Sequence, residues 1–155
     1  MLFRSSSYLN LVRLGVPEED ISTILMADHG LKLYGNAVIV NTDYAKNNSD
    51  MVKKFLVAIG AGWRDAIKDP KAAAAALVKR NPAADAALEQ RRLQLAIDAN
   101  VLTDYVKANG MGGVDSSRFA AAIEQLSETY EYKAAPNAAL YFTDEYLPAN
   151  GISLN

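Results

Sequence analysis

The sequence contains no cysteine and a single histidine among its 155 residues. Without cysteine, the chain can form no disulfide bond, no thiolate metal site and no cysteine nucleophile. One imidazole also excludes metal centres that are built from several histidines. We therefore expect no metal site, and the sequence shows no catalytic machinery.

The chain also lacks a basic excess and a long apolar run. Sixteen lysines and arginines stand against eighteen acidic residues, which gives a net charge of -2 and argues against a nucleic-acid partner. No stretch reaches the roughly 18 apolar residues that span a bilayer, so membrane insertion is not expected. Residues 1–15 lack the apolar core of a secretory signal, so the chain is expected to be cytoplasmic, already processed, or missing its true beginning.

Half of the residues are apolar and the mean hydropathy is -0.05, which is enough for a folded core in one domain of ordinary size. Two short apolar runs near the front, residues 21–26 and 37–40, predict β-strands. The second is continuous, as in a strand that is buried on both faces of a helix-covered sheet. A third short strand is expected over residues 139–142.

Helical patterns dominate the chain after residue 48. Asp69-Pro70 and Asn81-Pro82 each place a capping side chain before a proline, so each pair predicts a helix start, the second helix running to about Asn100. The alanine-rich run from Lys71 to Leu77 predicts a helix by propensity. One stripe at helical spacing is expected to be buried, and it comprises Val52, Phe55, Leu56, Ile59, Trp63 and Ile67.

Three further helices complete the expected layout. Serines 5 to 7 are expected to open a first helix, which Gly15 ends. A short helix is expected over residues 103–108, before the glycine-rich joint at residues 110–113. Asp115 is expected to cap a last long helix. The result is a helix-rich α/β chain.

Two groups of residues are candidates for binding or chemistry. Asp28 and His29 lie at the end of an expected strand, where acid–base groups are found in α/β proteins, but a turn that hydrogen-bonds locally is the favoured interpretation. Tyr34 and Asn36 flank a glycine at the entrance to the next strand. They can stack on and hydrogen-bond a flat small molecule, and a β-turn with a packed tyrosine is equally supported.

The run from Ala27 to Asn41, ADHGLKLYGNAVIVN, resembles a stretch of ABC-transporter substrate-binding proteins of the sulfonate, nitrate and thiamine-pyrimidine-precursor type. Residues 48–63, the two proline pairs and the glycine segment follow in the order expected for that family, so the likeness extends over residues 9–148. One departure is His29, where the family pattern has tyrosine.

The resemblance implies capture of a small molecule and its delivery to an ABC permease, without chemistry and without a cofactor, in the periplasm or another extracytoplasmic space. It implies Tyr34 and Asn36 as ligand contacts, with Asp28 and His29 as weaker candidates. It also implies part of a two-lobed type II periplasmic-binding fold. Residues 1–35 would then end the second lobe and cross over, and residues 36–155 would supply the return strand and helices of the first lobe.

Family members are longer than this chain, so the sequence is expected to be the C-terminal half of such a protein, as a single partial domain. An isolated half would expose the apolar flank of its sheet and self-associate. Two alternatives stay open. Thiamine-pyrimidine synthases share the fold and are enzymes, although they carry a cysteine-rich motif that this chain lacks. A free-standing helical interaction module would instead be a compact monomer.

Overall fold

The computed structural model describes residues 7–134 and 136–154 of the chain. The regular structure in these residues is helical, as predicted for a helix-rich chain. The α-helices are α1 (Leu9–Arg13), α2 (Thr42–Asn47), α3 (Ser49–Lys68), α4 (Pro70–Arg80), α5 (Ala86–Ala96), α6 (Asp104–Asn109) and α7 (Ser116–Thr129). Short 3-10 helices occur at Glu18–Asp20, Met26–His29 and Ala138–Leu140, and a π-helical turn at Ile97–Val101.

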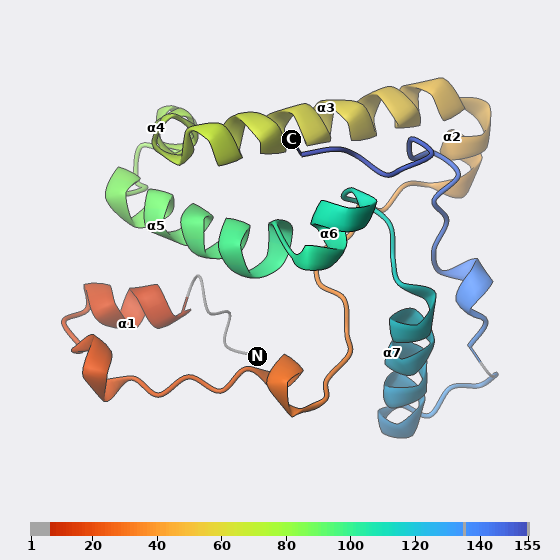
Figure 1. Ribbon diagram of the computed structural model, residues 1–155, viewed down its shortest axis with the longest axis horizontal. Helices are drawn as coiled ribbons and strands as arrows, with labels where there is room; N and C mark the ends of the chain where they lie inside the picture. The colour runs from red at the N-terminus through yellow and green to blue at the C-terminus, as the bar shows by residue number, and fades with distance from the viewer. Residues whose placement is uncertain (1–6, 135, 155) are drawn as a thin grey trace.

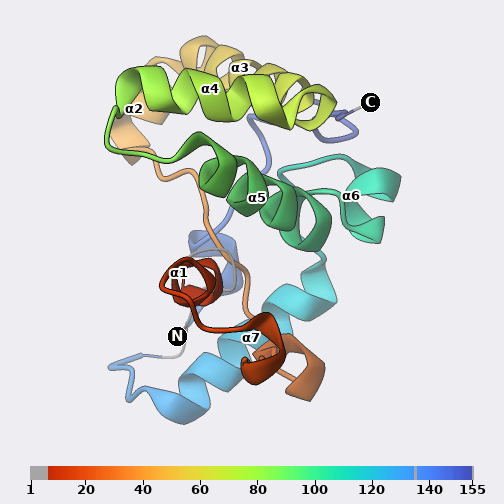
Figure 2. The ribbon, with the colours of Figure 1, turned by 90° about the vertical axis from the view of Figure 1, so that its left-hand side faces the viewer.

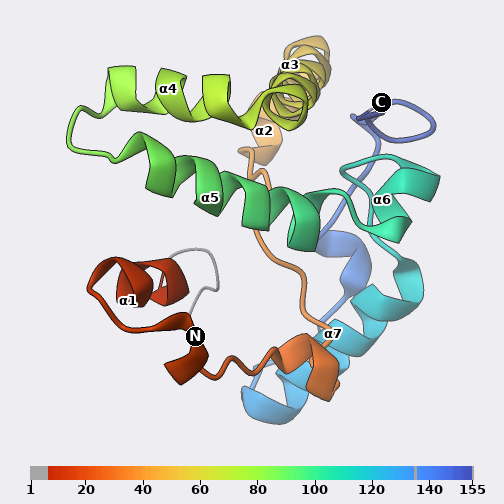
Figure 3. The same cartoon turned by 60° about the vertical axis from the view of Figure 1, so that its left-hand side comes forward.

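The helices form two regions. Helices α3, α4 and α5 pack against one another in sequence order, with α4 and α5 lying side by side (Figure 2). Helix α7 lies apart from them (Figure 1), and the N-terminal segment around Met26–His29 lies beside it (Figure 3). An extended stretch from residue 31 to residue 41 joins the two regions and leads into α2 (Figure 3).

Several helix boundaries confirm the capping predictions. The Asp69 side chain accepts a hydrogen bond from the Ala72 N–H at 2.9 Å, with Pro70 in the first position of α4. Asp115 caps α7 in the same way, accepting from the N–H of Arg118 at 2.7 Å. Each aspartate satisfies a backbone donor that has no partner within the helix.

The predicted helix start at Asn81-Pro82 is wrong. The Asn81 N–H donates to the Leu77 carbonyl, so Asn81 ends α4. Helix α5 begins at Ala86 instead, where the Asp85 side chain accepts from the Leu88 N–H at 2.8 Å. Two capping side chains lie four residues apart in the sequence, and the later one is used.

The first helix ends where predicted, and Ser7 and Tyr8 form a π-helical turn directly before it. Helix α1 begins at Leu9, and Gly15 follows it with a φ of 91°, as expected of a glycine that ends a helix. The predicted caps Ser5 and Ser6 lie outside the described residues.

The strand predictions are wrong for the described chain. Residues 21–25 and 31–41 are extended but unpaired, and residues 138–140 form a 3-10 turn. A strand needs a neighbour for its backbone groups, and no backbone hydrogen bond joins residues 35–40 to another described segment. The predicted burial is wrong too, because Val38 is 51% and Ile39 94% exposed. A single antiparallel bridge, between Met111 and Ile152, is the β-type pairing found in the described residues.

The buried core is small. The buried apolar residues of the described chain are Leu9, Ala45, Val52, Ala74, Ile97, Ala122 and Ile152. The predicted stripe on α3 is buried or half-buried except at Phe55, which is 54% exposed. The whole chain exposes 11566 Å², whereas a compact monomer of this mass exposes about 7,600 Å². The chain therefore leaves uncovered much of the surface that a domain of its size buries.

Candidate functional site

The segment that carries the predicted site residues is tied to α7 by side chains. The Gln125 amide donates to the Gly30 carbonyl at 2.8 Å and accepts from the Lys32 N–H at 2.9 Å. Arg118 donates from Nε to the Lys32 carbonyl at 3.1 Å and from a terminal nitrogen to the Leu33 carbonyl at 3.3 Å. These side chains satisfy backbone groups that a neighbouring strand would otherwise pair.

The turn before this segment depends on one glycine. Gly30 follows the 3-10 helix Met26–His29 with a φ of 93°, a left-handed conformation that glycine adopts without steric cost. The Leu31 N–H then donates back to the Met26 carbonyl at 3.0 Å. This turn directs residues 31–34 along the first turns of α7.

Tyr34 is fixed at the start of α7. Its hydroxyl accepts a hydrogen bond from the Asp115 N–H at 2.8 Å. The guanidinium of Arg118 lies over the ring at 4.9 Å, and the Phe119 ring is 6.2 Å away, centroid to centroid. A cation over an aromatic face is stabilising, so one face of Tyr34 and its hydroxyl are both engaged within the protein.

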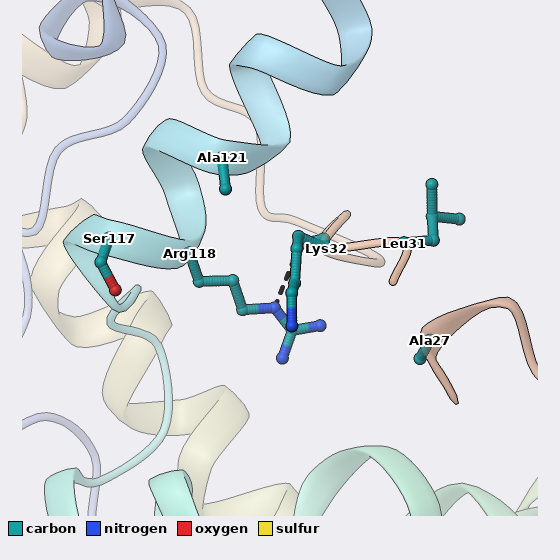
Figure 4. A pocket seen from close by; sticks show the side chains of 6 residues that line it. All are labelled: Ala27, Leu31, Lys32, Ser117, Arg118 and Ala121. Carbon is teal, nitrogen blue, oxygen red and sulfur yellow. Dashed lines mark hydrogen bonds between the residues drawn. The ribbon is translucent and has the colours of Figure 1, made fainter. Parts of the chain in front are cut away.

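A hollow of about 310 Å³ lies between this segment and α7. We call it the α7 pocket, and it is lined by Ala27, Leu31, Lys32, Ser117, Arg118 and Ala121. In Figure 4 the Lys32 and Arg118 side chains extend into the space between the helix and the turn that carries Ala27. The walls are small or apolar, and the charged groups at the pocket are two cations.

The electrostatics around the pocket are set by the α7 cap. The Asp115 carboxylate accepts from the Ser117 hydroxyl and from the Arg118 N–H, and these hydrogen bonds hold the pKa of Asp115 below its ordinary value. The cap satisfies donors at the helix N-terminus. The charges left over for a ligand are therefore the side-chain cations, Lys32 and Arg118.

The predicted site residues lie around the pocket and are not among the residues that line it. Asp28 and His29 are exposed in the 3-10 helix beside Ala27, and Asn36 is exposed in the extended stretch beyond Tyr34. The structure brings Tyr34 into contact with α7, and within the described residues no hydrogen bond or ion pair joins the side chains of the other three to that helix. Their role as ligand contacts remains a prediction.

Sequence reasoning missed Lys32, Arg118 and Gln125. The position of Arg118 was a signal. A cation in the first turn of a helix interacts unfavourably with the helix dipole, so an arginine there indicates a role in another interaction. Nothing comparable marks Lys32 or Gln125. Their importance follows from a contact across about ninety positions of sequence, which local patterns do not reveal.

A second hollow, of about 480 Å³, lies among α3, α4 and α5. It is lined mainly by apolar residues that include Trp63, Leu77 and Leu93. Its ionic groups, Glu89 and Arg92, form an ion pair with each other. With its charges already paired, this hollow offers less to orient a ligand than the α7 pocket does.

The residues that the structure describes contain neither a metal-binding cluster nor a membrane-spanning helix. No group of three or more histidine, cysteine, aspartate and glutamate side chains could hold a metal ion. No helix within residues 7–134 and 136–154 is long and apolar enough to cross a bilayer.

Comparison with known proteins gives one relationship. A family model described as NMT1/THI5 like matches residues 4–73. The matched part contains the Met26–His29 turn, Tyr34, Asn36, α2 and α3, and it ends in the first turn of α4. The match covers a little under half of the chain, and it broadly supports the family resemblance that was noted in the sequence. No curated protein and no solved structure matches the chain significantly.

Proposed function

We propose that this chain is part of a solute-binding protein of an ABC importer, which captures a small molecule for transport. The observation that carries the proposal is the match of residues 4–73 to the NMT1/THI5-like family. The α7 pocket lends support, because its volume of about 310 Å³ is in the range of small-ligand sites and its lining combines apolar walls with two cations. Candidate solutes are a thiamine-pyrimidine precursor, a sulfonate or nitrate.

We place the ligand contacts beside the pocket. Tyr34, Asn36, Asp28 and His29 are the proposed contacts, and no catalytic residue is assigned. Asp28, His29 and Asn36 are exposed and are available to a ligand or to a second lobe that closes over it. Tyr34 is 38% exposed and so presents part of its ring, although its hydroxyl and one face are already engaged.

We also propose that the chain supplies the C-terminal half of a two-lobed type II fold. Residues 36–155 would belong to the first lobe and residues 1–35 to the end of the second. Two observations support this proposal: the unpaired, exposed run at residues 37–40, and an exposed area about half as large again as that of a compact monomer. The intact protein would act outside the cytoplasm and dock on an ABC permease.

A ligand screen tests the binding function. Thermal unfolding of the chain, and of a longer protein that contains it, is followed with aminopyrimidines, alkanesulfonates and nitrate. A ligand that binds only the folded state at a hundred times its Kd adds about 2.7 kcal/mol to stability, and the melting temperature rises accordingly. Absence of stabilisation by all three classes in the longer protein contradicts the proposal.

The same screen separates the alternatives. A solute-binding protein returns its ligand unchanged, whereas a pyrimidine synthase contains iron or pyridoxal phosphate when purified and alters its substrate. A helical interaction module melts cooperatively as a compact monomer and responds to none of the small molecules.

A further inference from the structure

We infer that the α7 pocket binds the anionic group of a small ligand, such as a sulfonate, carboxylate or phosphate, between the Lys32 ammonium and the guanidinium of Arg118. The inference rests on the proposed function, in that it concerns the ligand of the same site. It goes further by assigning a charge to that ligand and by naming the two residues that select it.

The charged side chains that line the pocket are all cations. Its lining contains Lys32 and Arg118 and no carboxylate. Neither of these two side chains forms an ion pair with an acidic side chain of the described residues. The acid that interacts with Arg118 over a longer distance, Asp115, is engaged in capping α7. Two cations that line one hollow and form no ion pair there favour a bound anion.

The guanidinium of Arg118 is held in place by the protein. Two of its N–H groups are held by the carbonyls of Lys32 and Leu33, and its guanidinium lies over the Tyr34 ring. A guanidinium has five N–H donors, so three are left for a ligand. Because the group is already held in place, binding an anion costs less side-chain entropy than it would at a free surface arginine.

The pocket combines its cations with small and apolar side chains. Ala121 of α7 on one side and Leu31 and Ala27 on the other give the pocket an apolar lining beside the cations (Figure 4). A ligand with a charged end and a short apolar body satisfies both parts of the lining. The Ser117 hydroxyl already donates its hydrogen bond to the Asp115 carboxylate, so Ser117 is not counted among the groups that select the charge of the ligand.

The test compares ethanesulfonate with ethyl methyl sulfone, an uncharged molecule of nearly the same shape. Each is titrated into the ¹⁵N-labelled chain while the amide signals are followed by NMR. We expect ethanesulfonate to shift the signals of Leu31, Lys32, Ser117, Arg118 and Ala121 saturably, and the sulfone to shift them far less. Raising the salt concentration weakens the sulfonate complex, because the attraction is between charges near solvent.

Two variants assign the effect to the pocket. Lys32→Gln removes the ammonium and leaves the backbone bonds to Gln125 and Arg118, and we expect the Kd for ethanesulfonate to rise about fivefold through loss of a charge-assisted contact. Lys107→Gln removes a lysine on α6 and is the control, with an unchanged Kd.

Each other outcome has a defined meaning. Equal binding of sulfonate and sulfone, or an unchanged Kd for the Lys32→Gln variant, overturns the inference but not the proposed solute-binding function. Binding of aminopyrimidines alone, without sulfonate binding, also overturns the inference and leaves the proposed function standing. If the longer protein also binds none of the three classes of solute, the proposed function falls together with the inference.

Discussion

Gly60 of α3 lies directly against the side chain of Ile152, and this contact joins the C-terminal segment to the helical region. A Cβ atom added at Gly60 would overlap Cγ2 of Ile152. Both residues are buried, and Ile152 also pairs with Met111 through two backbone hydrogen bonds of 2.8 and 2.9 Å. Arg64, one turn further along α3, donates to the Ser153 carbonyl at 2.8 Å. The absence of a side chain at Gly60, in the middle of α3, therefore allows Ile152 to pack closely against the helix.

Gly60→Ala is expected to destabilise the protein. The added methyl group must displace Ile152, and overpacking of this kind costs about 1–3 kcal/mol. Gly62→Ala is the matched control, since nothing lies within 4 Å of its Cβ position and alanine is favoured over glycine in a helix by about 1 kcal/mol. Urea unfolding of both variants gives the comparison.

A third variant shows whether Ile152 is the cause. In an Ile152→Ala background the added methyl group has room, so Gly60→Ala is expected to cost less there than in the native chain. An equal cost in both backgrounds would show that the contact between Gly60 and Ile152 is unimportant.

Tyr34→Phe is expected to loosen the segment that leads into the α7 pocket. The variant removes the oxygen that accepts from the Asp115 N–H at 2.8 Å, and such a hydrogen bond contributes about 0.5–1.5 kcal/mol. Tyr44→Phe is the control, because Tyr44 is exposed on α2 and no hydrogen bond of its hydroxyl is found in the described part of the chain. Similar stability of the two variants would argue against a structural role of the Tyr34 hydroxyl.

The sequence predicted helices well where the signal is local. A capping side chain and the helix that it starts lie within a few residues, so Asp69 and Asp115 could be assigned from the chain itself. Asn81-Pro82 carries the same signal and is not used, because Asp85 caps α5 instead. A local pattern shows that a cap is available, and competition between neighbouring caps decides which one is occupied.

The strand at residues 37–40 could not be judged from local pattern, because a strand is defined by its neighbours. Its residues are apolar, and Val38, Ile39 and Val40 are β-branched, as favours a strand, yet no described segment pairs with it through backbone hydrogen bonds. The α7 pocket was missed for a related reason. Arg118 and Gln125 reach Lys32 only after α7 has packed beside a segment that is distant in sequence.

The stability of α7 is expected to depend on pH through Asp115. Hydrogen bonds from Ser117 and from the Arg118 N–H lower the pKa of this carboxyl from its ordinary value of 3.8 in the folded chain. The ionised form is therefore favoured by folding, and its contribution is complete above the unfolded pKa and is lost as the pH falls through the lowered value.

Asp115→Asn can still cap the helix but cannot ionise. We expect the native chain to lose stability relative to this variant as the pH is lowered from about 5 toward 3, near the unfolded aspartate pKa of about 3.9. Thermal unfolding at a series of pH values measures the difference. Parallel curves for the two proteins would contradict the assigned pKa shift.

The exposed apolar run at residues 37–40 is expected to cause self-association. Unpaired strand-like segments with apolar side chains pair with other chains, and a charged residue on such a segment prevents this. Ile39→Lys places a charge at a side chain that is 94% exposed, so the fold loses little packing while association decreases. Leu140→Lys is the control, because Leu140 is 78% exposed but lies in the 3-10 turn Ala138–Leu140. Sedimentation velocity at several concentrations measures the effect, and equal association of the two variants would show that the run at residues 37–40 is not the surface involved.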